Sequence, residues 1–190
     1  MSASCFDAGK ARFRALMRER VKSLDEEYIR ASDEGIMKNV LALDAFVRAR
    51  AVFAYCSVGR ECATAGIISV AHDMGKTVAL PRSKPGGVMD FATDEYGLHP
   101  AMYGIPEPAA EAGALSPQPG DIIIVPAVCC DVSGMRLGQG GGYYDRFLAD
   151  TPAVTACLCR TRLLQEKVPA EWNDIRVNFV ITEHDIIEIK

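Results

Sequence analysis

The sequence predicts an α/β fold: a single three-layer domain with helices on both faces of a mostly parallel sheet. Short apolar runs of strand length alternate along the chain with stretches whose apolar residues recur at helical spacing. This alternation is typical of parallel sheets covered by helices. With 190 residues, the chain is long enough for one sizeable core and too short for two. We therefore expect one domain over residues 1–190.

Two helices are predicted before the first strand. Ser4 can cap the first helix, whose apolar stripe comprises Phe13, Leu16, Met17, Val21 and Leu24. The second is predicted to begin near Ser32 and Asp33, and its stripe comprises Ile36, Val40, Leu43 and Val47. The period then changes, and the short apolar run "AVFAYCS" (residues 51–57) is predicted to be a buried strand.

Strands and helices continue to alternate after that point. Helical spacing returns in "CATAGIISVAHDMG", where Gly75 is predicted to cap the C-terminus, and "KTVALP" is the next strand. Residues 82–120 are rich in proline and glycine, which predicts loops around a short strand at "VMDFA". The later elements are predicted to be a buried strand in "DIIIVPAV", a helix in "YYDRFLAD", a strand in "AVTACLC" and terminal strands in "NFVIT" and "IIEIK".

The composition is that of an ordinary globular protein. The formal net charge of −4 provides no overall positive field for nucleic acid, so we expect no nucleic-acid partner. We identify no signal peptide and no apolar run of membrane-spanning length, and we expect a cytoplasmic protein with no membrane partner. The seven cysteines lack zinc-site spacing, and their odd number argues against complete disulfide pairing.

The segment "RLGQGGGYYDRF" (residues 136–147) carries the clearest chemical signal. Consecutive glycines let backbone N–H groups approach an anion, and the predicted position between the "IIIVP" strand and a helix favours phosphate binding. Asp145 could hold Mg²⁺ near phosphate oxygens. The segment is neither a Walker motif nor a dinucleotide fingerprint. A tight surface loop with capping glycines is the structural alternative.

This segment closely resembles the signature of the 5-formyltetrahydrofolate cyclo-ligase family, Arg-Leu-Gly-x-Gly-(Lys or Gly)-Gly-Tyr/Phe-Tyr-Asp. Similar features extend from Lys10 to about Thr182. The resemblance implies ATP-dependent cyclisation of 5-formyltetrahydrofolate to 5,10-methenyltetrahydrofolate, with release of ADP and phosphate. It also implies a fold related to that of sugar-phosphate isomerases and CoA-transferases. ATP, Mg²⁺ and a reduced folate are the implied ligands, and we expect a monomer.

The resemblance also implies which residues form the site. Those implied for ATP are Lys10, Arg14, Arg136, Leu137, Gly138, Gln139, Gly140, Gly141, Gly142, Tyr143 and Tyr144. Those implied for the folate are Cys56, Glu61, Gly140, Gly142 and Tyr143, and those for the metal are Asp145 and Asp174. A carboxylate such as Glu61 suits the amino-pyrimidinone edge of a pterin because it can accept two parallel N–H bonds.

The basic residues of the first helix leave two interpretations. From the sequence alone, Lys10, Arg14, Arg18 and Lys22 form a solvated basic face. The resemblance changes this interpretation for Lys10 and Arg14 only, which it implies contact ATP phosphates.

Two departures from the family pattern keep alternatives open. Gly141 occupies a position where many relatives have lysine, and Asn178 stands where some carry an acid. The first alternative is therefore a paralogue that binds folate or nucleotide without turnover. The second is a sugar-phosphate isomerase-like enzyme of related fold.

Overall fold

The computed structural model describes residues 3–84, 87–101 and 104–190, with the backbone alone for residues 3–8. Within these residues, eight strands form one sheet in the order β12-β11-β10-β7-β1-β2-β3-β6. The five strands from β11 to β2 run parallel, while β12, β3 and β6 are antiparallel to their neighbours. The strands are β1 (Ala51–Phe53), β2 (Thr77–Lys84), β3 (Val88–Thr93), β6 (Ala114–Leu115), β7 (Ile122–Val125), β10 (Val154–Leu158), β11 (Phe179–Ile181) and β12 (Ile186–Glu188).

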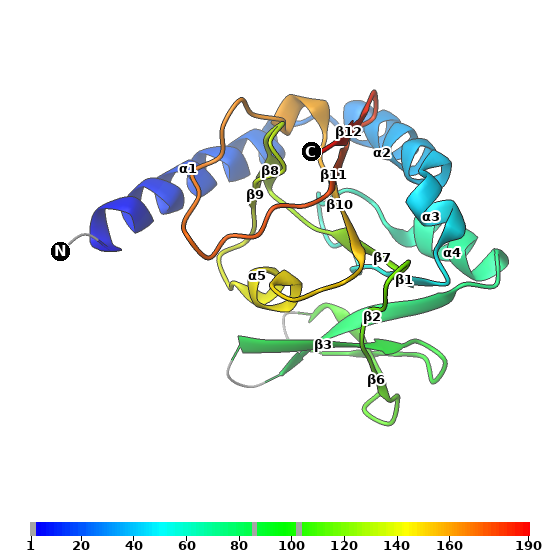
Figure 1. The fold of residues 1–190 in the computed structure, drawn as a ribbon. Helices are drawn as coiled ribbons and strands as arrows, with labels where there is room; N and C mark the ends of the chain where they lie inside the picture. The colour runs from blue at the N-terminus through cyan, green and yellow to red at the C-terminus, as the bar shows by residue number, and fades with distance from the viewer. Residues whose placement is uncertain (1–2, 85–86, 102–103) are drawn as a thin grey trace.

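Elements cover both faces of this sheet, which gives three layers (Figure 1). One face carries α2 (Glu26–Ala42), α3 (Asp44–Arg48) and α4 (Ala65–Asp73). The other carries α1 (Ala3–Ser23), α5 (Tyr143–Leu148) and a hairpin of β8 (Cys129–Cys130) and β9 (Arg136–Leu137). Successive side chains of β7 alternate between the two cores, as the pleat of a strand buried on both faces requires. The predicted α/β fold with a mostly parallel sheet is confirmed.

The predicted boundary between the first two helices is wrong. Helix α1 ends at Ser23 and α2 begins at Glu26, several residues before the expected start near Ser32. The reason is Asp25, whose carboxylate accepts a hydrogen bond from the backbone N–H of Tyr28 (2.7 Å) and so caps α2. Two glutamates in the first turn complement the helix dipole.

Two further details of the helices differ from the prediction. Ser4 lies inside α1, which begins at Ala3, so it is not the N-cap. Val47 is 47% exposed, because the chain leaves α2 after Ala42 and starts the separate helix α3 at Asp44. Phe46, one residue earlier, is the side chain that α3 buries.

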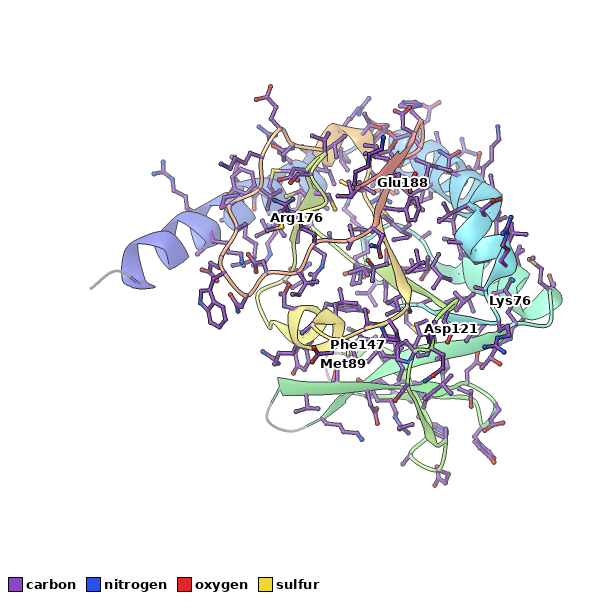
Figure 2. All side chains as sticks on the ribbon, in the orientation of Figure 1. Lys76, Met89, Asp121, Phe147, Arg176 and Glu188 are labelled. Carbon is purple, nitrogen blue, oxygen red and sulfur yellow. The ribbon has the colours of Figure 1, made fainter. Side chains whose placement is uncertain are left out.

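The turn between α4 and β2 forms as predicted. Gly75 has a φ of +70°, and its N–H donates to the carbonyl of His72 (2.8 Å) in a left-handed helix cap. Lys76 follows, and its Nζ donates to the carbonyls of Val47 and Ala49. Figure 2 places Lys76 at the end of the molecule farthest from α1. This turn lies before β2, at the edge of the sheet where the parallel strands begin.

Aromatic packing fixes α5 against β3. Phe147 of α5 lies beside Met89 in Figure 2, and its ring centroid is 4.7 Å from that of the fully buried Phe91. The Tyr144 ring also packs edge-on against Phe91, at 6.5 Å. The short helix is thus anchored by its apolar face, which positions the glycine-rich segment before it.

Among the described residues of the proline- and glycine-rich region, β4 (Leu98–Pro100) and β5 (Pro106–Pro108) pair as a small ribbon. A 3₁₀ turn, η3 (Thr161–Leu163), follows β10. Across the ranges that the structure describes, every helix is too short or too polar to cross a membrane.

Candidate active site

The candidate residues gather at one edge of the sheet. Because β1, β7 and β10 are parallel, their carboxyl ends meet there, and the loops that follow them carry the predicted residues. The glycine loop lies after β7 and before α5, as predicted, although it does not follow β7 directly. The β8–β9 hairpin intervenes, closed by a bond from the Val128 N–H to the Leu137 carbonyl (2.7 Å). Arg136 and Leu137 therefore belong to a buried strand, and the loop proper is residues 138–142.

The loop requires glycine at two positions. Gly140 has a φ of +103° and Gly142 a φ of +66°, which side chains strongly disfavour. A Cβ on Gly141 would lie 2.8 Å from the Tyr143 ring. Arg146 braces the loop, because its Nη2 donates to the carbonyls of Gly141 (2.8 Å) and of Gly87 before β3 (2.6 Å).

Cations from α1 approach the same loop. The Arg14 Nε donates to the Gly138 carbonyl (2.9 Å). Arg18, one helical turn later, donates to the Gln139 side-chain oxygen (2.7 Å) and to its backbone carbonyl (3.1 Å). Arg18 is exposed, as expected of a solvated face shared with Lys22, but its contact with the loop was not predicted. Its i+4 spacing from Arg14 was the available signal for this contact, whereas Lys22 forms an exposed ion pair with Glu19.

The first of the α1 cations is paired with a predicted metal ligand. The Lys10 Nζ lies 2.6 Å from both carboxylate oxygens of Asp174, and 3.6 Å from Glu171. The side chains of Lys10 and Asp174 are only 11% and 9% exposed. The backbone N–H of Glu171 also donates to Asp174 (2.7 Å). Both oxygens of Asp174 are therefore engaged.

The other predicted metal ligand, Asp145, lies against Arg136. Its Oδ1 accepts from the Arg136 Nη2 (2.8 Å) and from the Ile175 N–H (3.2 Å), while its Oδ2 accepts no hydrogen bond from the described residues. In that part of the chain, no three side chains of His, Cys, Asp or Glu gather as a metal site. Asp145 alone nevertheless fits a magnesium ion that arrives with a nucleotide, since Mg²⁺ commonly uses one or two carboxylates plus phosphate and water.

Two polar atoms beside this pair are buried without a partner among the described residues: the Arg136 Nε and the Tyr144 hydroxyl. The Arg136 guanidinium lies over the Tyr144 ring, 5.8 Å from its centroid. Burial raises the pKa of Tyr144 far above its ordinary value; the Arg136 charge opposes this, and the charges of Glu61 and Cys56 add to it. The hydroxyl therefore stays protonated and can donate. Leaving such groups unpaired costs free energy, which a ligand oxygen would recover.

Glu61 is held in a tight loop between β1 and α4. Its Oε2 accepts from the N–H of Val58 (3.0 Å), and Ser57 and Thr64 exchange reciprocal side-chain to backbone bonds at 3.2 Å. Burial raises the pKa of Glu61, and the bond from Val58 opposes this. Cys56, at the start of the loop, is half-buried, and burial raises the pKa of its thiol as well. Glu61 and Cys56 lie near enough to Tyr144 for their charges to add to the rise in its pKa.

The model of the 5-formyltetrahydrofolate cyclo-ligase family matches residues 7–183, nearly the whole chain. The chain belongs to this family. A 5-formyltetrahydrofolate cyclo-ligase of Mycolicibacterium smegmatis is 34% identical over 154 residues, covering 72% of this chain and 75% of the relative. The Escherichia coli K12 protein of the same name is 28% identical, covering 91% of this chain and all of the relative.

Solved structures agree with this assignment. The 5,10-methenyltetrahydrofolate synthetase of Aquifex aeolicus superposes with a TM-score of 0.81 at 26% identity, covering 95% of this chain and 93% of that one. A synthetase of Mycoplasma pneumoniae gives a TM-score of 0.74 at 16% identity, covering 92% and 98% of the two chains, and shows the fold alone. The predicted family, the fold and the assignment as a ligase-family enzyme are confirmed.

The structure brings most of the predicted residues together, while their individual roles stay predictions. The Leu137 side chain is fully buried in the core, so only its backbone could face a nucleotide. Asn178 bonds Thr155 at the start of β10, away from the carboxyl edge. Arg146 and Arg160 were missed by the sequence analysis. The available signal for Arg160 was its position directly after the buried "CLC" of β10.

Proposed function

We propose that this chain catalyses the ATP-dependent cyclisation of 5-formyltetrahydrofolate to 5,10-methenyltetrahydrofolate. The observation that carries the proposal is the pair of unpartnered buried atoms, the Tyr144 hydroxyl and the Arg136 Nε, in a site of the cyclo-ligase family. They belong to the segment whose glycine loop contacts Arg14 of α1, and the charge of Glu61 acts on Tyr144. Phosphate oxygens and a folate would supply the missing partners.

The formamide of the substrate needs activation because its oxygen is a poor leaving group. In the proposed reaction this oxygen attacks the γ-phosphorus of ATP, and the bond to the ADP oxygen breaks. The folate nitrogen at position 10 then attacks the formyl carbon and loses its proton, while the carbon–oxygen bond breaks and phosphate leaves. Such a sequence needs positioning and charge neutralisation, and no nucleophilic side chain.

The residues divide between these tasks. Lys10 and Arg14 neutralise the charge of the ATP phosphates, to which the backbone N–H groups of the glycine loop donate hydrogen bonds. Glu61 accepts hydrogen bonds from the N–H groups of the pterin edge. Tyr144 donates to the oxygen on which charge develops. When Mg²⁺ is bound with ATP, Asp145 would hold it through its free oxygen, and the ion would offset phosphate charge.

The direct test follows the near-ultraviolet absorbance of the methenyl product with purified protein, 5-formyltetrahydrofolate and MgATP. We expect an increase that stops when ATP is omitted or magnesium is chelated. An absorbance that stays constant while both ligands bind by calorimetry would instead support the paralogue without turnover, to which Gly141 points. Constant absorbance without binding would overturn the proposal.

We further propose that the protein acts as a monomer in the cytoplasm. Size-exclusion chromatography with light scattering tests this directly: a stable dimer would contradict it.

A further inference from the structure

Arg160 is the most extensively bonded buried cation in the described part of the chain, and no step of the proposed reaction uses it. Its side chain is 1% exposed, and Arg160 lies just beyond Cys159, the residue that follows β10. A buried arginine is costly unless its donors are satisfied. The partners of this one come from two separate parts of the chain: α2 and the loop that carries Glu61.

Two of its contacts hold the backbone of that loop. The Nη1 donates to the carbonyl of Arg60 (3.0 Å), and the Nη2 donates to the carbonyl of Glu61 (3.1 Å). The Nη1 also approaches the Cys62 thiol (3.5 Å). The guanidinium fork therefore spans consecutive peptide groups on either side of the Glu61 side chain.

The same guanidinium is fixed to α2. Its Nη2 donates to the Asp33 carboxylate (2.6 Å), and its Nε donates to the Ser32 hydroxyl (2.9 Å). Asp33 in turn accepts the N–H of Ala63 (3.1 Å), so it holds the far side of the loop. Arg160 and Asp33 together connect the peptide groups of residues 60, 61 and 63 to a rigid helix and to the central sheet.

We propose that Arg160, with Asp33 as its counter-ion, is a positioning residue that sets where the Glu61 carboxylate lies in the folate site. This inference rests on the proposed function of Glu61. In this proposal Arg160 does not touch the folate. It acts by holding the backbone carbonyls of Arg60 and Glu61. A small displacement of a recognition group can cost a large factor in affinity or rate.

Substitution Arg160→Lys keeps the positive charge near Asp33 but removes the fork that holds the two carbonyls. We expect it to raise KM for 5-formyltetrahydrofolate about 10-fold while KM for ATP changes less than about twofold. Asp33→Asn keeps an acceptor and weakens the ion pair, and it should shift the folate KM in the same direction by a smaller factor.

Ser32→Ala is the matched control. It removes the Nε contact to α2 and leaves both carbonyl contacts in place. It should therefore lower the melting temperature, as Arg160→Lys does, without changing either KM. If Arg160→Lys lowers only kcat and the melting temperature, or if it raises both KM values equally, Arg160 is a structural residue and the inference is wrong.

A double-mutant cycle with Glu61→Gln tests whether Arg160 acts through Glu61. In the Glu61→Gln background, Arg160→Lys should cause no further loss of folate affinity; an independent, additive loss would overturn the inference. Calorimetric titration with 5-formyltetrahydrofolate measures this affinity without turnover. If the wild-type protein yields no methenyl product, the proposed function fails, but the titration still tests the positioning role separately.

Discussion

The backbone conformation of the glycine loop yields the sharpest prediction. Replacing Gly142 by alanine places a Cβ on a residue with a φ of +66°, 2.7 Å from the Arg146 Nη1. The left-handed conformation costs an L-residue about 1–2 kcal/mol. Alanine also restricts the unfolded chain more than glycine does, and this stabilises the folded state by about 0.4–1 kcal/mol. Displacing Arg146 from the carbonyls of Gly141 and Gly87 costs about 1 kcal/mol more.

The net loss for Gly142→Ala is therefore about 2 kcal/mol, which lowers the melting temperature of a chain of this length by about 4–8 °C. Gly75→Ala is the matched control. Gly75 has a φ of +70° but no atom within 4 Å of the added Cβ, and it lies at the opposite edge of the sheet. It should lose only about 1 kcal/mol, or about 2–4 °C.

Thermal and urea unfolding measure these losses, and initial rates at varied ATP measure the effect on function. Only Gly142→Ala should raise KM for ATP, by about 10-fold, because only this variant moves the loop backbone. Equal KM values in the two variants would show that the loop does not contact the nucleotide. A Gly142→Ala protein as stable as the wild type would show that the left-handed conformation is absent.

Three further predictions concern charge and fluorescence. Lys10→Met should raise KM for ATP about 10-fold, whereas Lys22→Met, on the exposed side of α1, should leave it unchanged; equal effects would refute a phosphate role for Lys10. Burial raises the pKa of Glu61, so the folded state binds its proton more tightly, and stability falls as pH rises through the interval between the unfolded and folded pKa values. Glu61→Gln should therefore be more stable than the wild type at pH 7, but no more stable at a pH below the ordinary glutamate pKa, and it should bind folate more weakly. Urea unfolding at the two pH values measures the difference in stability. A variant that is less stable than the wild type at pH 7 would contradict this prediction. Trp172 is the sole tryptophan, is 96% exposed and lies two residues from Asp174. Binding of MgATP should rearrange the ion pair between Asp174 and Lys10 and so change the fluorescence emission of Trp172. Constant emission at saturating MgATP would argue against that rearrangement.

Local patterns were sufficient to predict most of the fold. Strands β7 and β10 are buried on both faces of the sheet. A strand buried on both faces needs apolar residues at every position, so it appears in the sequence as a continuous apolar run. The boundary between α1 and α2 was missed because a single hydrogen bond, from the Tyr28 N–H to Asp25, decides it. Apolar periodicity runs through that position, so it carries no signal of the break.

The site was predictable where its chemistry is local and unpredictable where it depends on distant contacts. The glycine loop was visible because its residues are consecutive. The partners of Arg160 are separated from it by up to 128 residues, and no spacing rule connects them. The pairing of Lys10 with Asp174 likewise joins two residues that were assigned to different ligands, and only the folded chain shows that they meet.

That pairing has a consequence for how the protein is made. The two residues are 164 positions apart, so Lys10 leaves the ribosome roughly 8–30 s before its partner at ordinary rates of synthesis. For most of that interval the apolar stripe of α1, including the fully buried Met17, lacks the strands that cover it. Contacts of such long range slow folding, because the entropy of closing the intervening chain is lost before they form. The candidate nucleotide site therefore stays incomplete until Asp174 has been synthesised, and a ligand that binds only the finished arrangement would hold α1 against the segment that carries Asp174 and protect both from proteases.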